Sequence, residues 1–339
     1  MPRPTSSEAS SSKALLVPSS TLASTWLNAP SCSDQRRTRR CTKLIAARAA
    51  TKVRVATPNA SSRLRIEIPN SARSIGFSPP GFRNVLTPPP LHRFTAPDRS
   101  KRMIYLGCAG WSISRPYVDA FPAQGSHLQR YARRLNAVEI NSAFYRPHRP
   151  ETYARWAASV PTTFRFSVKL PRTITHEQRL HACGPLLDGF LAQCGQLGER
   201  LGCLLVQLPP SLAYDAQMAR RFFEALRERH AGPVAVEPRH ASWHAAQSML
   251  VALRIAQVAA SPPRLVSDAE PGGWPGLEYW RLHGEPRVYY SAYSDHYLQA
   301  LAARLRASAA SQTDIWCIFD NTAAGAALGN ALATWDQLC

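Results

Sequence analysis

The sequence predicts an α/β protein, a TIM-like (β/α)8 barrel preceded by a disordered, basic N-terminal segment. Residues 103–339 alternate short apolar runs with amphipathic stretches, giving about eight strand–helix units in 237 residues, and such barrels typically take about 250 residues. Several runs, such as Cys203–Val206, are apolar at every position, which is typical of parallel strands covered on both faces. An open doubly wound sheet is the alternative, but Gly110-Trp111-Ser112 after the first strand is not a glycine-rich dinucleotide-binding turn.

The division at residue 102 is indicated by charge and by aromatic content. The chain carries a formal net charge of +19, of which +14 falls in residues 1–102 and +5 in residues 103–339. The first part contains four aromatic residues and the second contains 26. A segment rich in Ser, Pro and Arg buries too little apolar surface to offset its ordering entropy, so we expect it to be disordered.

Three interpretations of residues 1–102 stay open. The segment is a basic arm that contacts phosphates or anionic surfaces, or an Arg- and Ser-rich targeting peptide with few acids. In the third interpretation, translation from an upstream start adds it to a domain that begins at Met103, where a strand-like run opens.

The elements of the barrel are expected in alternating order along residues 103–339. The expected strands are Ile104–Cys108, Ala137–Ile140, Phe164–Val168, Cys203–Gln207, Val234–Glu237, Ile255–Ala259, Tyr279–Leu282 and Ile315–Phe319. The expected helices are Leu128–Leu135, Tyr153–Ser159, Leu186–Leu197, Ala216–Arg229, Ala245–Leu253, Tyr297–Ala307 and Ala323–Leu338. No helix is evident after the sixth strand.

Cysteine usage and hydropathy predict a cytoplasmic protein. The eight cysteines are scattered without a Cys-x-x-Cys pair, as expected for reduced cysteines that serve in packing. The sequence has no secretory signal, and no run of 18 apolar residues that would span a membrane.

The polar residues that follow the strands are the candidate functional residues. In a barrel of this class the carboxyl ends of the strands meet on one face, where active sites lie. A ring of charged side chains there is costly to desolvate without a purpose. The candidate catalytic residues are Glu139, Lys169, Glu237 and His283, and the candidate substrate-binding residues are Trp111, Asn141, Tyr145, His176, Gln207, Arg239, His240, Arg281, Asp320 and Asn321.

Each candidate also has a structural interpretation. Glu139 and Glu237 would be neutralised internally by Lys169 and Arg239. The histidines would cap or bond the backbone, Asp320-Asn321 would cap the last helix, and the tryptophans would pack in the core. Lys169 is the single lysine after residue 103, against 22 arginines, and is a candidate base, Schiff-base amine or anion holder.

The cofactor is not defined by the sequence. Oxygen and imidazole ligands from several strand ends suit a divalent metal such as Mg²⁺, Mn²⁺ or Zn²⁺. No His-Glu-x-x-His, Gly-x-Ser-x-Gly or P-loop motif is present.

The motifs from Met103 to about Leu338 resemble the DUF72 family of YecE-like uncharacterised proteins, which implies a TIM-like barrel. The pieces that carry the resemblance are Gly110-Trp111-Ser112, Val138–Asn141 with Phe144-Tyr145, Phe166–Pro171 with Thr175-His176, Leu205–Pro210, Glu237–His240 with Ser242-Trp243, Arg281–Gly284, and Phe319–Thr322 with Gly325, Ala327, Asn330 and Ala331. Where the family often has Ala-Asp after the sixth strand, this chain has Ala260-Ser261, so one carboxylate is missing, although Asp268 lies in the next loop.

Three functional hypotheses follow. The first is an enzyme with a polar pocket at the strand ends that acts on a small polar or anionic substrate by hydrolase- or lyase-type acid/base chemistry. In it, Glu139 and Glu237 are the acid/base groups, Lys169 and Arg239 are anion holders or electrophiles, and His283 moves protons. The second is a nucleic-acid-binding protein or metal-assisted phosphodiesterase, and the third is a barrel that binds a ligand without catalysis. The sequence leaves the oligomeric state open.

Overall fold

The structure is a computed structural model that describes residues 103–264, 268–310 and 313–338. The strands are β1 (Ile104–Ala109), β2 (Ala137–Ile140), β3 (Arg165–Lys169), β4 (Leu201–Gln207), β5 (Val234–Glu237), β6 (Ala256–Gln257), β7 (Ala259–Ser261), β8 (Gly272–Gly273), β9 (Leu277–Leu282) and β10 (Asp314–Phe319). The α-helices are α1 (His127–Tyr131), α2 (Pro150–Ala158), α3 (Gly184–Cys194), α4 (Ala216–Arg229), α5 (Gln247–Ala252), α6 (Asp295–Ala309) and α7 (Ala326–Leu338). The disorder expected for residues 1–102 lies outside the described residues.

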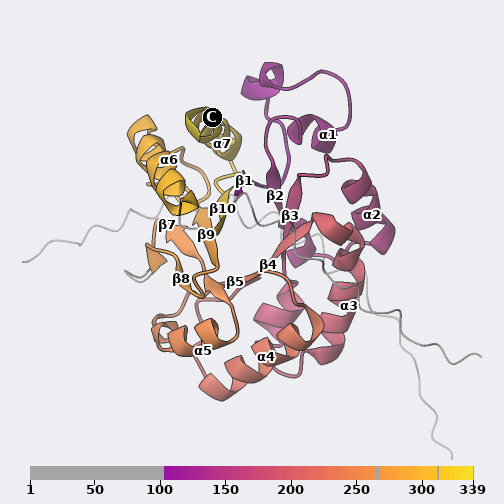
Figure 1. The fold of residues 1–339 in the computed structure, drawn as a ribbon, viewed down its shortest axis with the longest axis vertical. Coiled ribbons are helices and arrows are strands. Elements are labelled where there is room, and N and C mark those ends of the chain that lie inside the picture. The colour runs from indigo at the N-terminus through magenta and orange to yellow at the C-terminus, as the bar shows by residue number, and fades with distance from the viewer. Residues whose placement is uncertain (1–102, 265–267, 311–312, 339) are drawn as a thin grey trace, which may run out of the picture. The chain divides into compact units, whose positions relative to one another are not determined.

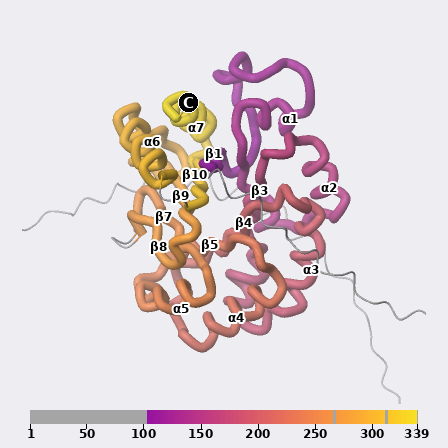
Figure 2. The backbone as a smooth tube through the Cα atoms, viewed as in Figure 1, coloured from indigo at the N-terminus to yellow at the C-terminus, as the bar shows by residue number. Residues whose placement is uncertain are grey.

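The strands form one sheet that curls into a barrel. Their order is β7-β9-β10-β1-β2-β3-β4-β5-β6-β8, and neighbours are parallel except β6 and β8, which are antiparallel. Because only Val258 separates β6 from β7, and these pair with β5 and β9 respectively, the two ends of the sheet meet at residues 256–261. Helices surround the strands (Figures 1 and 2), so the predicted α/β barrel is confirmed.

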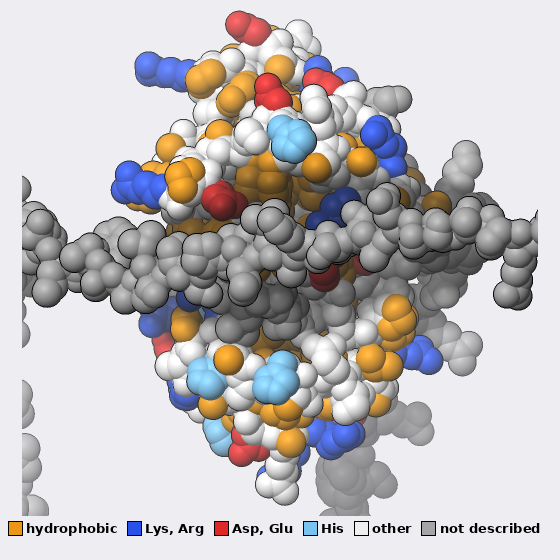
Figure 3. Space-filling view, turned by 90° about the vertical axis from the view of Figure 1, so that its left-hand side faces the viewer, with side chains coloured by type: hydrophobic (Ala, Val, Ile, Leu, Met, Phe, Trp, Pro, Cys, Tyr) orange, Lys and Arg blue, Asp and Glu red, His pale blue; other side chains and the backbone are white. Residues whose placement is uncertain are grey.

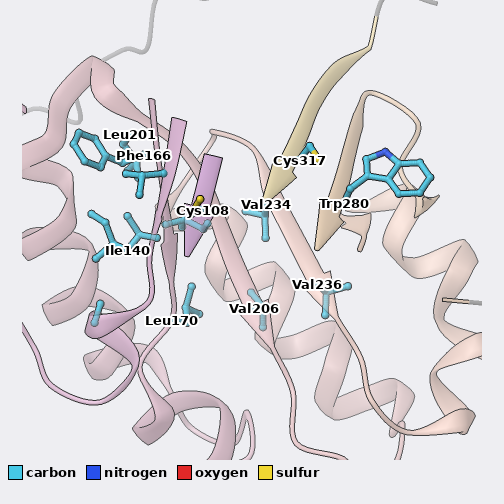
Figure 4. Packing of buried hydrophobic residues seen from close by; sticks show 14 of the residues in the cluster. Cys108, Ile140, Phe166, Leu170, Leu201, Val206, Val234, Val236, Trp280 and Cys317 are labelled. Carbon is cyan, nitrogen blue, oxygen red and sulfur yellow. The ribbon is translucent and has the colours of Figure 1, made fainter. Parts of the chain in front are cut away.

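The outer face of the barrel packs against the helices. Cys108, Phe166, Val206, Val236 and Cys317 are buried there, and they project from β1, β3, β4, β5 and β10 (Figure 4). Helix α4 shows how a helix covers this face. Its N-terminus is capped by Asp215, whose carboxylate accepts a hydrogen bond from the Met218 backbone N–H at 2.8 Å. Its buried residues recur three and four positions apart, which places them on one stripe; they are Met218, Ala219, Phe222, Phe223 and Leu226.

The lower part of the barrel interior is filled by small and aromatic side chains. Tyr279 and Trp316 stack with their planes 1° apart and their centroids at 5.9 Å. A Cβ on Gly107 would lie 1.9 Å from the Ala137 carbonyl oxygen, so the close approach of β1 to β2 at this position requires glycine. The floor of the barrel is therefore a packed core, and the buried carboxylates Glu139, Glu237 and Asp320 lie toward its other end.

The structure differs from the expected elements mainly near the sixth strand. The strand expected at Ile255–Ala259 is divided into β6 and β7, and the two-residue strand β8 was not anticipated. Among the described residues between β7 and β9 there is no α-helix, as expected. In the same described part of the chain, no helix is long and apolar enough to cross a membrane. Five cysteines there are free and buried: Cys108, Cys183, Cys194, Cys203 and Cys317.

Candidate functional site

Side-chain alternation along the strands brings the predicted polar residues together inside the barrel. Because successive residues of a strand point to opposite faces, the inward positions of β2 and β9 follow from Ala137 and Tyr279, which lie in the interior core. The next inward positions, toward the carboxyl ends of the strands, are polar. They are Glu139 on β2, Ser167 and Lys169 on β3, Gln207 on β4, Glu237 on β5, Arg281 and His283 at β9, and Asp320 after β10.

Arg281 is the centre of this polar cluster. Its side chain is 1% exposed, and it contacts three carboxylates from three different strands. Its Nε and Nη2 donate to the two oxygens of Glu139 at 3.0 and 2.8 Å, a bidentate contact. Its Nη1 donates to Glu237 Oε2 at 3.1 Å, and its Nη2 lies 2.9 Å from Asp320 Oδ2. One guanidinium therefore ties β2, β5 and the end of β10 together.

His283 bridges two of these carboxylates. Its Nδ1 lies 3.1 Å from Asp320 Oδ2 and its Nε2 lies 3.1 Å from Glu237 Oε1. Burial favours the neutral imidazole, but Glu237 and Asp320 outweigh it and raise the pKa of His283. The pair of acceptors therefore favours an imidazolium that donates from both nitrogens.

The two carboxylates next to His283 are held in the ionised form. Burial alone would raise the pKa of Glu237, yet Arg281, Arg239 and His283 together hold that pKa well below its usual range. Burial likewise opposes ionisation of Asp320, but Arg281 and His283 outweigh it and lower the pKa of Asp320. Both carboxylates are thus acceptors at neutral pH.

Further hydroxyl and guanidinium groups position the carboxylates. The Tyr279 hydroxyl lies 3.1 Å from Glu139 Oε2 and 2.9 Å from Ser167 Oγ, so it can donate to the carboxylate while it accepts from the serine. Arg239 donates to Glu237 Oε1 from Nε at 3.0 Å and from Nη2 at 2.7 Å, and to the Tyr289 hydroxyl at 3.3 Å.

Sequence reasoning missed three of these residues. Ser167 and Tyr279 lie two positions before predicted residues on the same strands, so two-residue periodicity would have indicated them. Tyr289 gave no signal in the sequence. It adopts a φ of +70°, a conformation that is costly for a bulky residue, and its ring lies edge-on to His283 at 5.5 Å.

Lys169 differs from the two arginines of the cluster. Its side chain is buried and its Nζ lies 4.1 Å from the centroid of the Phe144 ring. Within the described part of the chain, no carboxylate lies within ion-pair distance of this amine, whereas Arg281 and Arg239 are both paired. Burial, and then the charge of Arg281, lower the pKa of Lys169 to about 8, although three carboxylates act in the opposite direction. The expected ion pair between Glu139 and Lys169 is therefore not formed, and Glu139 pairs with Arg281 instead.

The side of the cluster next to Lys169 is electropositive. His176 packs edge-on against Phe144 at 4.9 Å. Burial lowers the pKa of His176, and four cations, Lys169, Arg172, Arg239 and Arg179, lower it further. Tyr145 also packs edge-on against Phe144, at 4.9 Å, and is 70% exposed.

Seven of the ten predicted binding residues lie outside the hydrogen-bonded network around Arg281, and Tyr145, His176 and Asn321 are among them. Trp111 packs against Trp156 at 5.0 Å. His240 caps the short turn Ala241–Ala246 by accepting from the Ser242 backbone N–H, which is the structural role considered for it. Asn141 and Gln207 have no side-chain hydrogen bond to another described residue, and the Asn141 Oδ1 atom is buried.

Asp320 and Asn321 do not act as a simple helix cap. Asp320 instead contacts Arg281 and His283. Asn321 donates from Nδ2 to the Ser291 carbonyl and to Asn330 Oδ1, and its own Oδ1 is buried without a partner among the described residues.

Ser261 occupies the position after the sixth strand at which a carboxylate was expected from the resemblance. Ser261 stands at the end of β7, and its backbone carbonyl accepts from the His283 N–H. Asp268 lies 3.5 Å from Gln257, whose side chain is bonded to Gln247 on α5, outside the barrel.

The carboxylates do not form an evident metal site. No group of three or more His, Cys, Asp or Glu side chains in the described residues is arranged to hold a metal ion. Arg281 occupies the position at which the oxygens of Glu139, Glu237 and Asp320 converge. A cavity lined by Pro271–Pro275, Glu278 and Thr313 lies near the starts of β9 and β10, away from this cluster.

The fold and the polar strand ends define this protein as a parallel α/β barrel with a charged cluster at the carboxyl ends of its strands. The family model described as "Protein of unknown function DUF72" matches residues 105–339. The chain belongs to the DUF72 family, as the motifs predicted.

Relatives and solved structures agree with this assignment. The chain is 36% identical over 107 residues to UPF0759 protein YecE of Escherichia coli K12, covering 32% of this chain and 38% of that protein. It is 26% identical over 149 residues to UPF0759 protein YunF of Bacillus subtilis 168, covering 42% of this chain and 52% of that protein. The matched regions thus span about half or less of these relatives.

Two crystal structures of DUF72 family proteins share the fold. One is from Enterococcus faecalis V583, with a TM-score of 0.59, 23% identity, and coverage of 70% of this chain and 95% of that chain. The other is from Thermotoga maritima MSB8, with a TM-score of 0.57, 25% identity, and coverage of 70% and 99%.

Proposed function

We propose that this protein is an enzyme that binds a small anionic substrate at the carboxyl end of the barrel, in contact with Lys169. The single observation that carries the proposal is the state of Lys169, a buried cation without a carboxylate partner among the described residues. A buried charge without a partner is costly. An anionic substrate would supply a negatively charged partner for the Lys169 ammonium group.

The electrostatics of the neighbouring residues support an anion as the ligand. Lys169, Arg172, Arg239 and Arg179 all lower the pKa of His176, so their positive potential converges on that side of the cluster. The carboxylates Glu139, Glu237 and Asp320 are paired with Arg281, and Glu237 is also paired with Arg239. An anion that reaches Lys169 is thus screened from direct repulsion by Glu139 and Glu237.

The roles proposed from the sequence are refined by these contacts. Both oxygens of Glu139 are bonded by Arg281, which supports a positioning role for this residue in place of acid/base catalysis. Glu237 and Asp320 are acceptors for His283, and His283 is the group best placed to hold and move a proton. Lys169 contacts the substrate, and Gln207 and Asn141 retain free hydrogen-bonding capacity within the described site.

A ligand screen with matched variants tests the proposal. Thermal unfolding is followed with phosphate, citrate, pyruvate and glyoxylate, for the wild type, Lys169→Met and Arg165→Met. Arg165 begins the same strand, at the opposite end of the barrel, and bonds the Thr162 and Phe164 carbonyls, so its removal controls for the loss of one cation. The proposal requires an anion to raise the Tm of the wild type and of Arg165→Met but not of Lys169→Met.

Other results would favour the alternative functions. An equal shift in all three proteins, or none with any anion, contradicts the proposed site. A ligand that binds at Lys169 and is recovered unchanged after prolonged incubation favours the barrel that binds without catalysis. Nucleic-acid binding that falls steeply with salt, with no response to small anions, favours the second hypothesis. On the face seen in Figure 3, acidic and basic side chains are interspersed, unlike a phosphate-binding stripe.

A further inference from the structure

Building on the proposed function, we propose that Lys169 attacks the carbonyl carbon of a small anionic carbonyl compound, such as a 2-oxo acid, and holds it as a Schiff base. This assigns the substrate class and a covalent step to the same site. The inference depends on the placement of the Lys169 amine, on the charges that act on it, and on the protonated imidazole in the same cluster.

The placement of the amine leaves it free to act as a nucleophile. Lys169 is the last residue of β3 and its side chain is 5% exposed. Its Nζ lies against the face of Phe144 and is within ion-pair distance of no carboxylate in the described residues. The nearby carboxylates Glu139 and Glu237 are instead committed to Arg281 at 2.8 and 3.1 Å. A lysine that served only to neutralise these carboxylates would contact them.

The surroundings also favour the neutral amine, which is the reactive form. Burial and the adjacent Arg281 lower the pKa of Lys169 from 10.5 to about 8. At pH 7 the neutral fraction is then roughly 300-fold greater than for an ordinary lysine. Desolvation next to another cation is a recognised way of activating an amine toward carbonyl compounds.

The covalent step balances with groups that are present in the cluster. The nitrogen lone pair of the neutral amine attacks the carbonyl carbon, and a proton passes from the nitrogen to the carbonyl oxygen to give a neutral carbinolamine. The nitrogen then forms the C=N bond as the C–O bond breaks, and the hydroxyl group leaves as water after receiving a proton. No oxidant or reductant is needed. Glu237 and Asp320 raise the pKa of His283, so the cluster holds a protonated imidazolium that can supply this proton.

The anionic group of the substrate is matched to the electropositive side of the cluster. The cations that converge on His176 include Lys169 itself and Arg239. When Lys169 becomes part of a protonated imine it keeps one positive charge, so an adjacent substrate carboxylate would remain paired. A neutral aldehyde or ketone would lack this contact.

Reductive trapping of the full chain tests the inference. The protein is incubated with glyoxylate or pyruvate and sodium cyanoborohydride, which reduces an imine to a stable secondary amine. Digestion and mass spectrometry then locate the added carboxymethyl or carboxyethyl group. The four other lysines, Lys13, Lys43, Lys52 and Lys101, give the background in the same digest.

The expected result is selective labelling of Lys169, about tenfold or more faster at pH 7 than the background lysines. The Lys169 rate should level off above about pH 8, whereas ordinary lysines continue to gain reactivity toward pH 10. In Arg165→Lys, a lysine at the other end of β3 should label no faster than the background. Acetaldehyde, which lacks an anionic group, should label Lys169 more slowly than glyoxylate relative to that background.

The outcomes separate this inference from the proposed function. If anions raise the Tm in a Lys169-dependent manner but Lys169 is not labelled above background, the Schiff base is refuted and the anion site stands. If neither response occurs, both proposals fail. Equal labelling of all five lysines also overturns the inference.

Discussion

Replacing Lys169 by methionine should stabilise the fold at neutral pH. Lys169 is buried, and its protonated form has lost hydration without gaining a salt bridge to a described residue. Methionine has a side chain of similar length, and fills the same space without charge. The substitution therefore removes the desolvation cost of the Lys169 ammonium group and retains the contact with Phe144.

The magnitude follows from the shifted pKa. A lysine whose pKa falls from 10.5 to about 8 on folding lowers stability, at pH values where both states are protonated, by about 3 kcal/mol. Between pH 8 and 10.5 the unfolded state binds more protons than the folded state, so wild-type stability rises with pH. The advantage of Lys169→Met should thus be greatest below pH 8 and should vanish near pH 10.5.

Urea unfolding of both proteins at pH 7 and at pH 10 measures this difference. Lys169→Arg is the control, because arginine keeps its charge at every pH used and its disadvantage relative to wild type should grow as the pH rises. Loss of stability in Lys169→Met at pH 7, or a gain that does not change with pH, would refute the reasoning. The first result would mean that the attraction of the carboxylates outweighs desolvation.

Three further predictions concern the remainder of the cluster and the barrel floor. Tyr279→Phe should destabilise the protein by about 1.5–3 kcal/mol, because the buried Glu139 carboxylate loses the hydrogen bond donated by the Tyr279 hydroxyl. An unchanged urea midpoint would argue against this contact. Gly107→Ala should cost more than about 4 kcal/mol, because its Cβ would overlap the Ala137 carbonyl; a Tm within a few degrees of wild type would show that the strands can separate there. The folded pKa values of Glu237 and Asp320 are lowered, so their stabilising contribution is present above about pH 4.5 and is lost as the pH falls through the folded values. Circular dichroism between pH 6 and 2 should show acid unfolding that starts at a higher pH in Glu237→Gln than in the exposed control Glu224→Gln on α4; coincident curves would contradict it.

The cluster also shows how a set of buried charges can exist in a stable barrel. Three carboxylates converge on Arg281, and Arg239 and His283 neutralise Glu237 further. Each ion is compensated by bonded partners, which is the condition under which burial of charge is tolerated. Lys169 is the exception, and so it is the group on which both proposals depend.

Much of the fold was predictable from local sequence. The strand expected at Ala137–Ile140 coincides with β2, and the helix expected at Ala216–Arg229 coincides with α4. These elements depend on short-range periodicity and on caps such as Asp215, which act within a few residues. The prediction for the sixth strand was the least accurate, because its division into two depends on the pairing of β6 with β5 and of β7 with β9.

The members of the candidate site were also largely predictable, because a charged residue at the inward position of a strand end is costly to bury unless other groups compensate it. Their partners were not. Glu139 was open to pairing with Lys169 on the adjacent strand β3, yet it binds Arg281, 142 residues away. Tyr289 joined the cluster although nothing in its surrounding sequence indicated a role.

The sequence alone therefore determined the order of the elements outside the region of the sixth strand, most members of the polar cluster, and the family. Only the tertiary structure decided which charges meet, and that Lys169 is left without a carboxylate partner among the described residues. The physical reason is that hydrophobic periodicity acts within a few residues of the chain. Contacts across the barrel depend instead on how the sheet closes and on the register between strands, which bring β9 and β10 beside one another in parallel, with Arg281 and Asp320 at their carboxyl ends.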